Sequence, residues 1–389
     1  PKLVIINVDI KDKKLIEDIS GVNYSDYEKF LKKLEYSDES PIYNIGENWR
    51  LISHSDTWVY LAKYISREDL EKFKTICIQI LTEEHPKYKL TTDKRYMASF
   101  YNATPKYSNE IKKGVSETII ILSVFGKKYG ITALDNPKAF VNQIVNSILN
   151  NANGELYRSL GYNLMLLAEA APEVFLNQVQ SIIEDKRVMA FFEEEGGIMG
   201  SSNDLPFLLW SLESIAWIPE LLTKTSSILC QLVELAPKKL PTSNTPYNTL
   251  KSIFKTWHPQ TNATFEERKQ VLEVIAQKHS TVGFQLLNSL IFGRNDHAMP
   301  THKMQWRLFE EARAVSITNL EVFETENFAV DKMLEIINQG NDINQILSLI
   351  TKFDSLRKNN IDKFLDCLKK LDKSEIEKVI KGYIENFFV

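Results

Sequence analysis

The chain has 389 residues, of which 43% are hydrophobic and 25% are charged, and its formal net charge at pH 7 is -4. A chain of this length is too long for one compact core, so we expect two or more domains or one extended array. The composition is typical of globular proteins, and the negative net charge argues against broad electrostatic binding to nucleic acid or to an anionic membrane.

The apolar runs and the cysteines indicate in which cellular compartment the protein is expected. No apolar run reaches the ~20 residues that span a bilayer, and the longest, Thr118–Phe125, predicts a buried helix. Cys77, Cys230 and Cys367 lie far apart among apolar residues, which favours buried thiols in a reducing environment over a redox or metal site. The chain also shows no signal peptide. We therefore expect a cytoplasmic protein without a membrane partner.

Residues 1–66 differ from the rest of the chain in their sequence pattern, which combines short helical and strand-like stretches. The chain opens on Pro1 rather than Met and runs directly into an apolar, strand-like stretch at 3–6, so we expect it to begin inside a longer polypeptide. A short helix at 14–19 follows, and Gly21 is placed to end it in a left-handed cap.

A second helix and two strands complete this amino-terminal section. Ser25 and Glu28 have the spacing of a capping box, in which each side chain satisfies a free backbone donor at the start of a helix. Residues 41–45 and 49–52 then read as two short strands around a turn. Two helices followed by a β-wing are the plan of a winged helix, so we predict a small winged-helix-like module at 1–66.

From residue 67 onward the apolar residues recur at the helical spacing. A cap formed by Ser66 and Asp69 precedes the first clear apolar stripe, and Pro137 stands at the first turn of a later helix, where its missing N–H is harmless. The stretch 90–107 is less regular and rich in Tyr and Lys, and we interpret it as a crossing between layers.

Weak internal similarity indicates an array of helical hairpins. The segments 166–172 and 231–237 both end on Ala-Pro, where a helix must stop and the chain turns into the next one, and 274–279 is a fainter copy without the Pro. The irregular spacing favours a degenerate array over a strict tandem repeat. We therefore predict a mainly all-α fold, an α-α superhelix over 67–328, with a helical continuation over 329–389.

Motifs for catalysis, nucleotide binding or metal binding are incomplete. Gly126 and Lys127 lack the first Gly and the hydroxyl residue of a phosphate-binding loop, and Gly200–Asp204 lacks the second Gly of a nucleophile elbow. His297 and His302 are five residues apart with no Cys nearby, which is unlike the usual zinc spacings. We expect this chain to be non-catalytic and to carry no metal or cofactor of its own.

One polar segment, 294–307, stands out among the apolar stripes. Loops on a rigid scaffold often carry function, so we take it as a candidate partner-binding surface. Its candidate residues are Arg294, Asp296, His297, His302, Lys303, Trp306 and Arg307. The alternative is an inter-helix loop whose Arg and His side chains cap helix ends. A similar stretch at 256–263 contains Trp257, which we expect to pack in the core.

Four short motifs, in succession, resemble the large helical region of bacterial STAND-type NTPases of the Avs antiviral kind. They are Leu164–Leu176, Leu208–Trp217, Ser252–Thr261 and Pro300–Arg307. The section from Asp18 to Ser53 also resembles the winged-helix module that follows the NTPase core in such proteins. The resemblance covers about residues 1–310, and its specificity comes from the order of the motifs, because each motif is short.

The resemblance implies a pathogen sensor. In this family an amino-terminal effector, often a nuclease, precedes the ATP-binding core, and the helical array binds a conserved phage protein such as a terminase or portal subunit. Target binding drives ATP-dependent oligomerisation, which activates the effector. This chain would supply the winged-helix module and the helical sensor, so ATP and Mg²⁺ would be bound elsewhere in the full-length protein. Its expected partners are the phage protein, the NTPase core of the same polypeptide and further copies of itself.

The resemblance also offers a role for one histidine. Winged helices of STAND proteins can place a His against the nucleotide diphosphate, and His54 follows the second predicted strand at a suitable position. Capping of the next helix by Ser53 or Ser55 explains the same segment equally well.

Two other classes of protein share this fold. One is a winged-helix transcription regulator with a helical ligand or dimerisation domain. Against it, the candidate recognition helix at 24–36 has as many acidic as basic residues, whereas DNA readers usually carry a positive excess. The other is a generic helical interaction scaffold without an NTPase partner.

Overall fold

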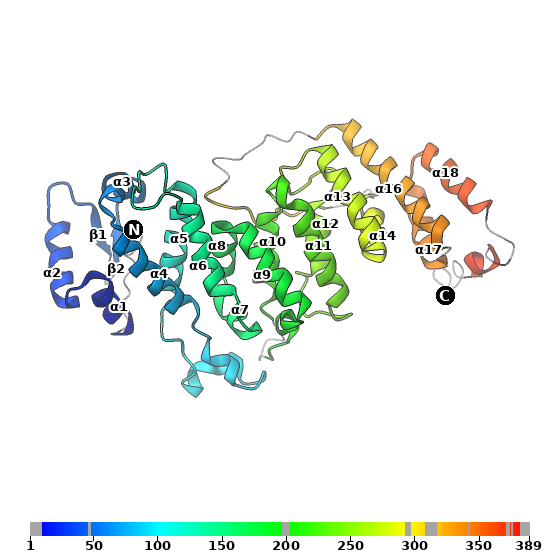
Figure 1. The fold of residues 1–389 in the computed structure, drawn as a ribbon. Helices are drawn as coiled ribbons and strands as arrows, with labels where there is room; N and C mark the ends of the chain where they lie inside the picture. The colour runs from blue at the N-terminus through cyan, green and yellow to red at the C-terminus, as the bar shows by residue number, and fades with distance from the viewer. Residues whose placement is uncertain are drawn as a thin grey trace. The chain divides into compact units, whose positions relative to one another are not determined.

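The computed structural model describes residues 10–45, 48–196, 203–291, 297–307, 317–340, 342–370, 374 and 376–381. These residues are mostly helical (Figure 1), which confirms the predicted mainly all-α class. Among them, one antiparallel pair of strands, β1 (Ile42–Ile45) and β2 (Asn48–Leu51), places Ile42 opposite Leu51. The predicted opening strand at 3–6 lies outside the described residues.

Contacts between Cα atoms divide the chain into two compact units, and the division falls inside helix α10 (Leu205–Ile215). Unit 1 comprises the described residues of 1–211, 239–242 and 304–309, and unit 2 comprises those of 212–238, 243–303 and 310–389. The domain limits 1–66, 67–328 and 329–389 stay predictions.

The amino-terminal part of unit 1 has the expected plan of two helices and a β-wing. Its elements are α1 (Ile10–Ser20), α2 (Tyr24–Glu35), β1, β2, α3 (His54–Leu61) and the 3₁₀ turn η1 (Ala62–Tyr64). A small apolar cluster of its own, which includes Ile16, Leu31 and Trp49, holds the helices against the strands. Gly21 ends α1 with a φ of 73°, the left-handed cap that the sequence indicates.

The start of α2 differs from the expectation. The helix begins at Tyr24, before Ser25, and its cap residue Asn23 makes no side-chain cap bond. Instead, the Tyr24 N–H donates to Oε1 of Glu17 at 2.8 Å. The predicted box of Ser25 and Glu28 is therefore wrong, because a carboxylate from the preceding helix satisfies the free donor.

The rest of unit 1 is a set of antiparallel helices. They are α4 (Arg67–Leu81), α5 (Asn109–Phe125), α6 (Pro137–Leu149), α7 (Gly154–Leu160), α8 (Asn163–Ala170), α9 (Pro172–Glu184), the 3₁₀ helix η4 (Arg187–Phe192) and the first part of α10. Every residue of α8 is buried, and α8 packs against α5, whose middle is buried all round. The capping box of Ser66 and Asp69 and the turn before Pro172 are as predicted.

Between α4 and α5 the chain makes an excursion with two 3₁₀ helices, η2 (Pro86–Lys89) and η3 (Arg95–Tyr101). We call residues 85–107 the lobe. The lobe does not cross between helical layers; it projects beyond the end of α4 (cyan in Figure 1).

Unit 2 contains a second set of helices. They are α11 (Pro219–Leu235), α12 (Pro246–Ile253), α13 (Phe265–Lys278), α14 (Ser280–Leu290), α16 (Asn319–Gly340), α17 (Ile343–Ile350), the 3₁₀ turn η5 (Phe353–Ser355) and α18 (Lys358–Leu368). The hairpin of α13 and α14 turns at His279, where the sequence shows its fainter third copy. Thr264 and Glu267 form a capping box at the start of α13.

The structure confirms the expectation for the cysteines and corrects the expectation for Trp257. Cys77, Cys230 and Cys367 are all buried free thiols, as expected. Trp257 is not a core residue: it is 38% exposed in the loop after α12 and stacks on His258, with 6.0 Å between the ring centroids. Its neighbour Thr256 is buried instead and donates to the carbonyl of Leu290 at 2.8 Å.

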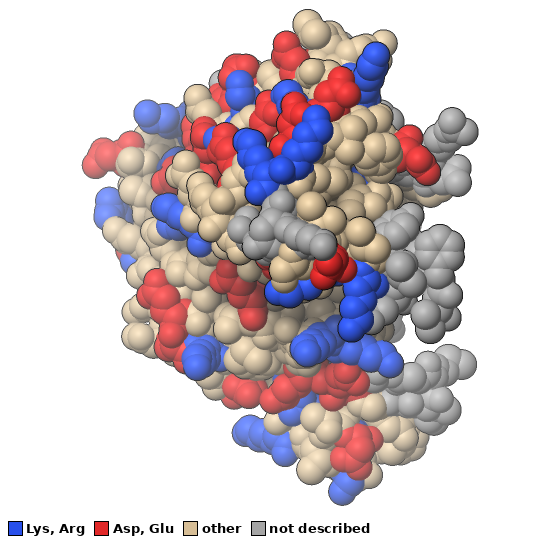
Figure 2. All heavy atoms as spheres, turned by 90° about the vertical axis from the view of Figure 1, so that its right-hand side faces the viewer, with Lys and Arg blue, Asp and Glu red and all other residues tan. Residues whose placement is uncertain are grey.

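Charges of both signs are interspersed on the face of the molecule in Figure 2. Lys and Arg side chains alternate there with Asp and Glu, and no broad area of one sign covers the described residues of this face. On this face, positive and negative side chains are therefore mixed rather than separated into one basic and one acidic patch.

Candidate partner-binding surfaces

The predicted binding segment is described over residues 297–307, and its first half packs on unit 2. Nε1 of Trp217 donates to Oγ1 of Thr301 and to the carbonyl of His302, at 3.2 and 3.1 Å. Oε2 of the nearly buried Glu213 lies 3.1 Å from the backbone nitrogen of His302 and 3.0 Å from its Nδ1. The ammonium of Lys303 lies 3.8 Å from the centroid of the Trp217 ring.

The second half of the segment packs on unit 1, at the carboxyl end of α8. The buried carboxylate of Glu169 accepts hydrogen bonds from the backbone N–H groups of Gln305, Trp306 and Arg307. The Arg307 guanidinium donates to the carbonyls of Glu169 at 2.7 Å and of Ala170 at 3.1 Å, so it caps the last turn of α8. Burial raises the pKa of Glu169, although the three N–H donors act in the opposite direction.

The predicted partner-binding residues therefore have different surroundings. Arg294 and Asp296 lie outside the described residues, whereas His297 and Lys303 are exposed. His302, Trp306 and Arg307 make the internal contacts given above, and the Trp306 ring also meets Phe125 edge-on with 6.2 Å between the centroids. Capping by Arg307 is the structural role that the sequence left open as an alternative.

His54 is the first residue of α3, and its side chain lies outside the described part of the molecule. Oγ of Ser53 accepts a hydrogen bond from the Asp56 N–H at 3.2 Å, so Ser53 is the cap of this helix. The nucleotide-sensing role of His54 stays a prediction.

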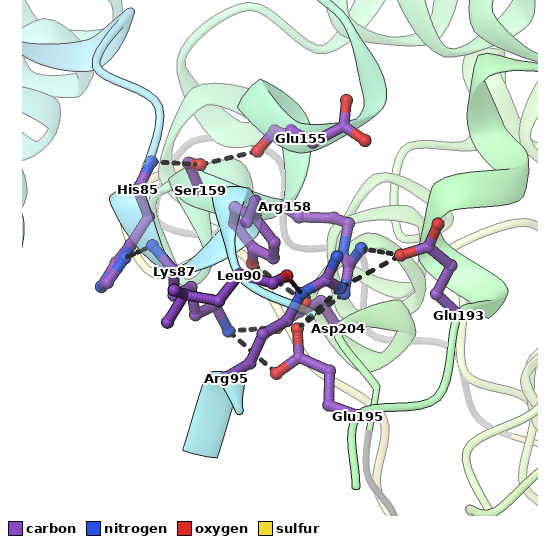
Figure 3. A network of polar contacts seen from close by, with 11 residues as sticks. His85, Lys87, Leu90, Arg95, Glu155, Arg158, Ser159, Glu193, Glu195 and Asp204 are labelled. Atoms are coloured by element: carbon purple, nitrogen blue, oxygen red, sulfur yellow. Dashed lines mark hydrogen bonds and ion pairs between the residues drawn. The ribbon is translucent and has the colours of Figure 1, made fainter. Parts of the chain in front are cut away.

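Sequence reasoning missed a second candidate surface, the lobe, which is anchored by a cluster of charged side chains (Figure 3); most of them are buried, whereas the side chain of Glu193 is 44% exposed. At its centre Arg158, from α7, has a fully buried side chain. Its guanidinium reaches Glu193 at 2.8 Å, Glu195 at 2.7 Å and Asp204 at 2.9 Å. These carboxylates come from segments 35 to 46 residues further along the chain, which gives the cluster a long-range character.

Three side chains of the lobe join this cluster from the other side. Arg95 donates to Glu193 at 3.0 Å, and Lys87 pairs with Glu195 at 3.2 Å. The Tyr88 hydroxyl donates to Asp204 at 3.0 Å, and the Arg158 guanidinium carbon lies 4.5 Å from the centroid of the Tyr88 ring. Three cations and three carboxylates therefore balance one another, as buried charges require.

The electrostatics of the cluster follow from this pairing. Burial alone would raise the pKa of Glu193, but hydrogen bonds from Arg95 and Arg158 outweigh it and lower that pKa below its usual 4.5. Burial and the charge of Asp204 raise the pKa of Tyr88, so its hydroxyl keeps the proton that it donates.

The two ends of the lobe are fastened separately. At its start the His85 N–H donates to Oγ of Ser159 at 2.7 Å. At its end the carboxylate of Glu83 accepts from the backbone N–H groups of Lys106 and Tyr107 and pairs with the buried Lys112 at 2.9 Å. Start, middle and end are all tied to the helices of unit 1, so the lobe is a well-anchored projection.

One arrangement elsewhere resembles an activated nucleophile. In unit 2, Nε2 of His279 lies 3.1 Å from Oγ of Ser227, and its Nδ1 lies 2.9 Å from Oε1 of Glu234. Ser227 stands inside α11 rather than on an exposed turn, and the described cavities are lined by other residues. We interpret these hydrogen bonds as a structural link between α11 and the turn that joins α13 to α14.

Among the described residues, no three His, Cys, Asp or Glu side chains gather as a metal site requires, and no helix is both long and apolar enough to cross a membrane. An apolar cavity of about 520 Å³ opens between α17, α18 and residues 376–380, lined among others by Ile350, Leu365 and Val379. No family model, no curated protein and no solved structure matches the chain.

Proposed function

We propose that this chain is the non-catalytic regulatory and sensor segment of a bacterial antiviral STAND NTPase. In this proposal its helical array binds a phage protein, and binding triggers oligomerisation and activation of an effector elsewhere in the polypeptide. Helical arrays offer extended surfaces for such recognition, because each repeat exposes part of one continuous face.

The observation that supports this proposal best is that the motifs behind the resemblance bond to one another. Glu169, in the first motif, accepts hydrogen bonds from Trp306 and Arg307 in the last. In unit 2, Trp217 of the second motif and Gln260 of the third both bond Thr301 of the last motif. The four motifs are therefore joined by tertiary contacts, as parts of one sensor scaffold would be.

The DNA-binding alternative has weaker support. On α2, the candidate recognition helix, Lys29 pairs with Asp26 at 3.0 Å and Lys32 pairs with Glu28 at 3.0 Å. The acids beside these lysines cancel their charge locally, so this helix presents no positive excess of the kind that DNA-binding surfaces carry. A salt-dependent shift of duplex DNA by this protein would favour the regulator over the sensor.

The test uses the full-length polypeptide. Its reading frame is expected to encode a GxxxxGK[ST] loop upstream of Pro1, where the resemblance places the NTPase core. When it is co-expressed with phage terminase or portal proteins one at a time, we expect it to retain one of them, to hydrolyse ATP faster and to increase in molecular mass.

Two outcomes would count against the proposal. Absence of the upstream loop, or failure to retain any member of the panel, would overturn it. Retention of a partner without any change in ATP hydrolysis or mass would favour the generic helical scaffold instead.

A further inference from the structure

We propose that the lobe is a docking surface for a protein partner that presents acidic side chains around an apolar recess. This inference rests on the proposed function, because it names the part of the sensor that meets the target. It moves the expected contact away from residues 297–307, several of which are engaged in internal contacts.

Large aromatic side chains are exposed on η3. Phe100 is 84% exposed, and Tyr96 and Tyr101 are 47% and 46% exposed. The three aromatic residues lie within one short stretch of the chain, which is kinked at Met97, where φ is -108° and ψ is 27°. Aromatic side chains are the residues that interfaces most often bury at their centres.

Basic side chains outnumber acidic ones among the exposed residues of the lobe. Lys89, Lys94 and Lys106 are exposed, and Asp93 is the one exposed acid within residues 85–107; Glu193, which is also exposed, faces Arg95 of the lobe. The Lys94 ammonium lies 5.6 Å from the centroid of Tyr101, so a cation flanks the aromatic group directly. A surface with a local positive excess in a chain of net charge -4 is complementary to an acidic partner.

The contacts at both ends of η3 hold it in one conformation. Arg95, the first residue of η3, points into the Arg158 cluster (Figure 3), and Asn102 ends η3 in a left-handed conformation with a φ of 54°. The Ala103 N–H then donates to the Ala98 carbonyl at 2.9 Å and closes the turn. A surface fixed before binding loses less conformational entropy on association, which favours affinity.

The charge of the lobe favours a protein over single-stranded nucleic acid. The other cations of the lobe, Lys87 and Arg95, are neutralised by Glu193 and Glu195. Three exposed lysines fall short of the roughly 6–10 phosphate contacts typical of nucleic-acid binding.

The test compares variants of the full-length polypeptide in the capture assay described above. Phe100→Ala with Tyr101→Ala is expected to weaken retention of the phage protein about tenfold or more, and Lys94→Glu to weaken it in the same direction. Tyr36→Ala is the matched control, because Tyr36 is also 84% exposed but lies at the end of α2. Circular dichroism melts should be unchanged in all variants, since these side chains contribute little to the fold.

The outcomes separate this inference from the proposed function. Capture by the wild type and the control but not by the lobe variants supports the inference. Equal capture by all variants overturns it and leaves the proposed function standing. If the wild type captures none of the panel, the proposed function fails and this inference falls with it. Binding of a labelled oligothymidylate of about 20 nucleotides that the lobe variants lose would overturn it in favour of nucleic acid.

Discussion

Arg158 and the carboxylates around it determine how the lobe is held. Its guanidinium is fully buried and meets one carboxylate with each of its three nitrogens. A buried charge is tolerated only when it is paired and hydrogen-bonded, and the loss of one partner leaves the others uncompensated.

Replacement of Arg158 by Met is expected to destabilise unit 1 by about 3–5 kcal/mol, because Glu195 and Asp204 would remain buried without their main cation. Urea unfolding should report the loss, and hydrogen exchange should show faster exchange of the lobe amides. Lys89→Met is the control: Lys89 is exposed in the same lobe, and its loss should stay within about 0.5 kcal/mol. Equal effects of the two variants would contradict the assigned role of the cluster.

The pH dependence of the same cluster has a definite sign. The pKa of Glu193 is lower in the folded chain than its usual 4.5, because Arg95 and Arg158 hold its charged form against the effect of burial. A carboxyl group with a lowered pKa in the folded state stabilises the fold at pH values above its pKa in the unfolded chain. This contribution to the free energy of unfolding is lost as the pH falls through the pKa of the folded state.

We therefore expect Glu193→Gln to lower the urea midpoint of unit 1 at neutral pH. The difference from the wild type should shrink as the pH falls below 4.5. A difference that stayed constant down to about pH 3 would show that the carboxylate charge of Glu193 is not what matters.

At the scale of elements, helix pairs depend on small residues where their backbones approach. A Cβ added at Gly283, in α14, would lie 2.7 Å from Cα of Ala276 in α13. The three nearest atoms, Cα and N of Ala276 and the carbonyl oxygen of Ile275, all belong to the backbone of α13, so none of them can move aside as a flexible side chain would.

Gly283→Ala is thus expected to destabilise unit 2 by about 1–3 kcal/mol, although Ala is the better helix former. Gly340→Ala, at the end of α16, is the matched control, since no heavy atom lies within 4 Å of its added Cβ. The control should be neutral or slightly stabilising. Thermal melts of both variants provide the measurement, and a stable Gly283→Ala protein would show that the hairpin has room to adjust.

At the scale of the whole molecule, the two contact units are expected to unfold separately. Arg158 lies in unit 1 and Gly283 in unit 2. Distant substitutions that share no partners add within about 0.5 kcal/mol.

Hydrogen exchange in rising urea should therefore show Arg158→Met lowering protection in unit 1 and Gly283→Ala lowering it in unit 2. The double variant should show both effects with their single-variant sizes. If either substitution shifted both units together, the chain would be one cooperative unit.

Features that depend on near neighbours were predictable from the sequence. Ser66 with Asp69 and Pro137 were predicted as helix starts, and the structure has them there, because a cap involves residues only three or four apart. The prediction was wrong where the partner came from the preceding helix, seven residues away, as Glu17 does for the first N–H of α2.

The candidate surfaces were less predictable. The segment at 297–307 was noticed for its polar residues, but its anchors Glu169 and Glu213 lie about 90 to 140 residues away. The lobe was noticed only as an irregular stretch rich in Tyr and Lys. Its content of aromatic and basic residues was the available signal, and its anchoring to Arg158 left no local pattern.

The sequence by itself determined that this is a mainly helical chain with a short β-wing near its start, since apolar periodicity, caps and Ala-Pro turns are local properties. Only the tertiary structure decided which polar residues are engaged in internal contacts and which remain on the surface. Arg307 and Arg95 are both arginines in polar stretches, yet one caps α8 and the other anchors the lobe. Their partners are fixed by long-range contacts, and the free energy of burying a charge depends on those partners rather than on sequence neighbours.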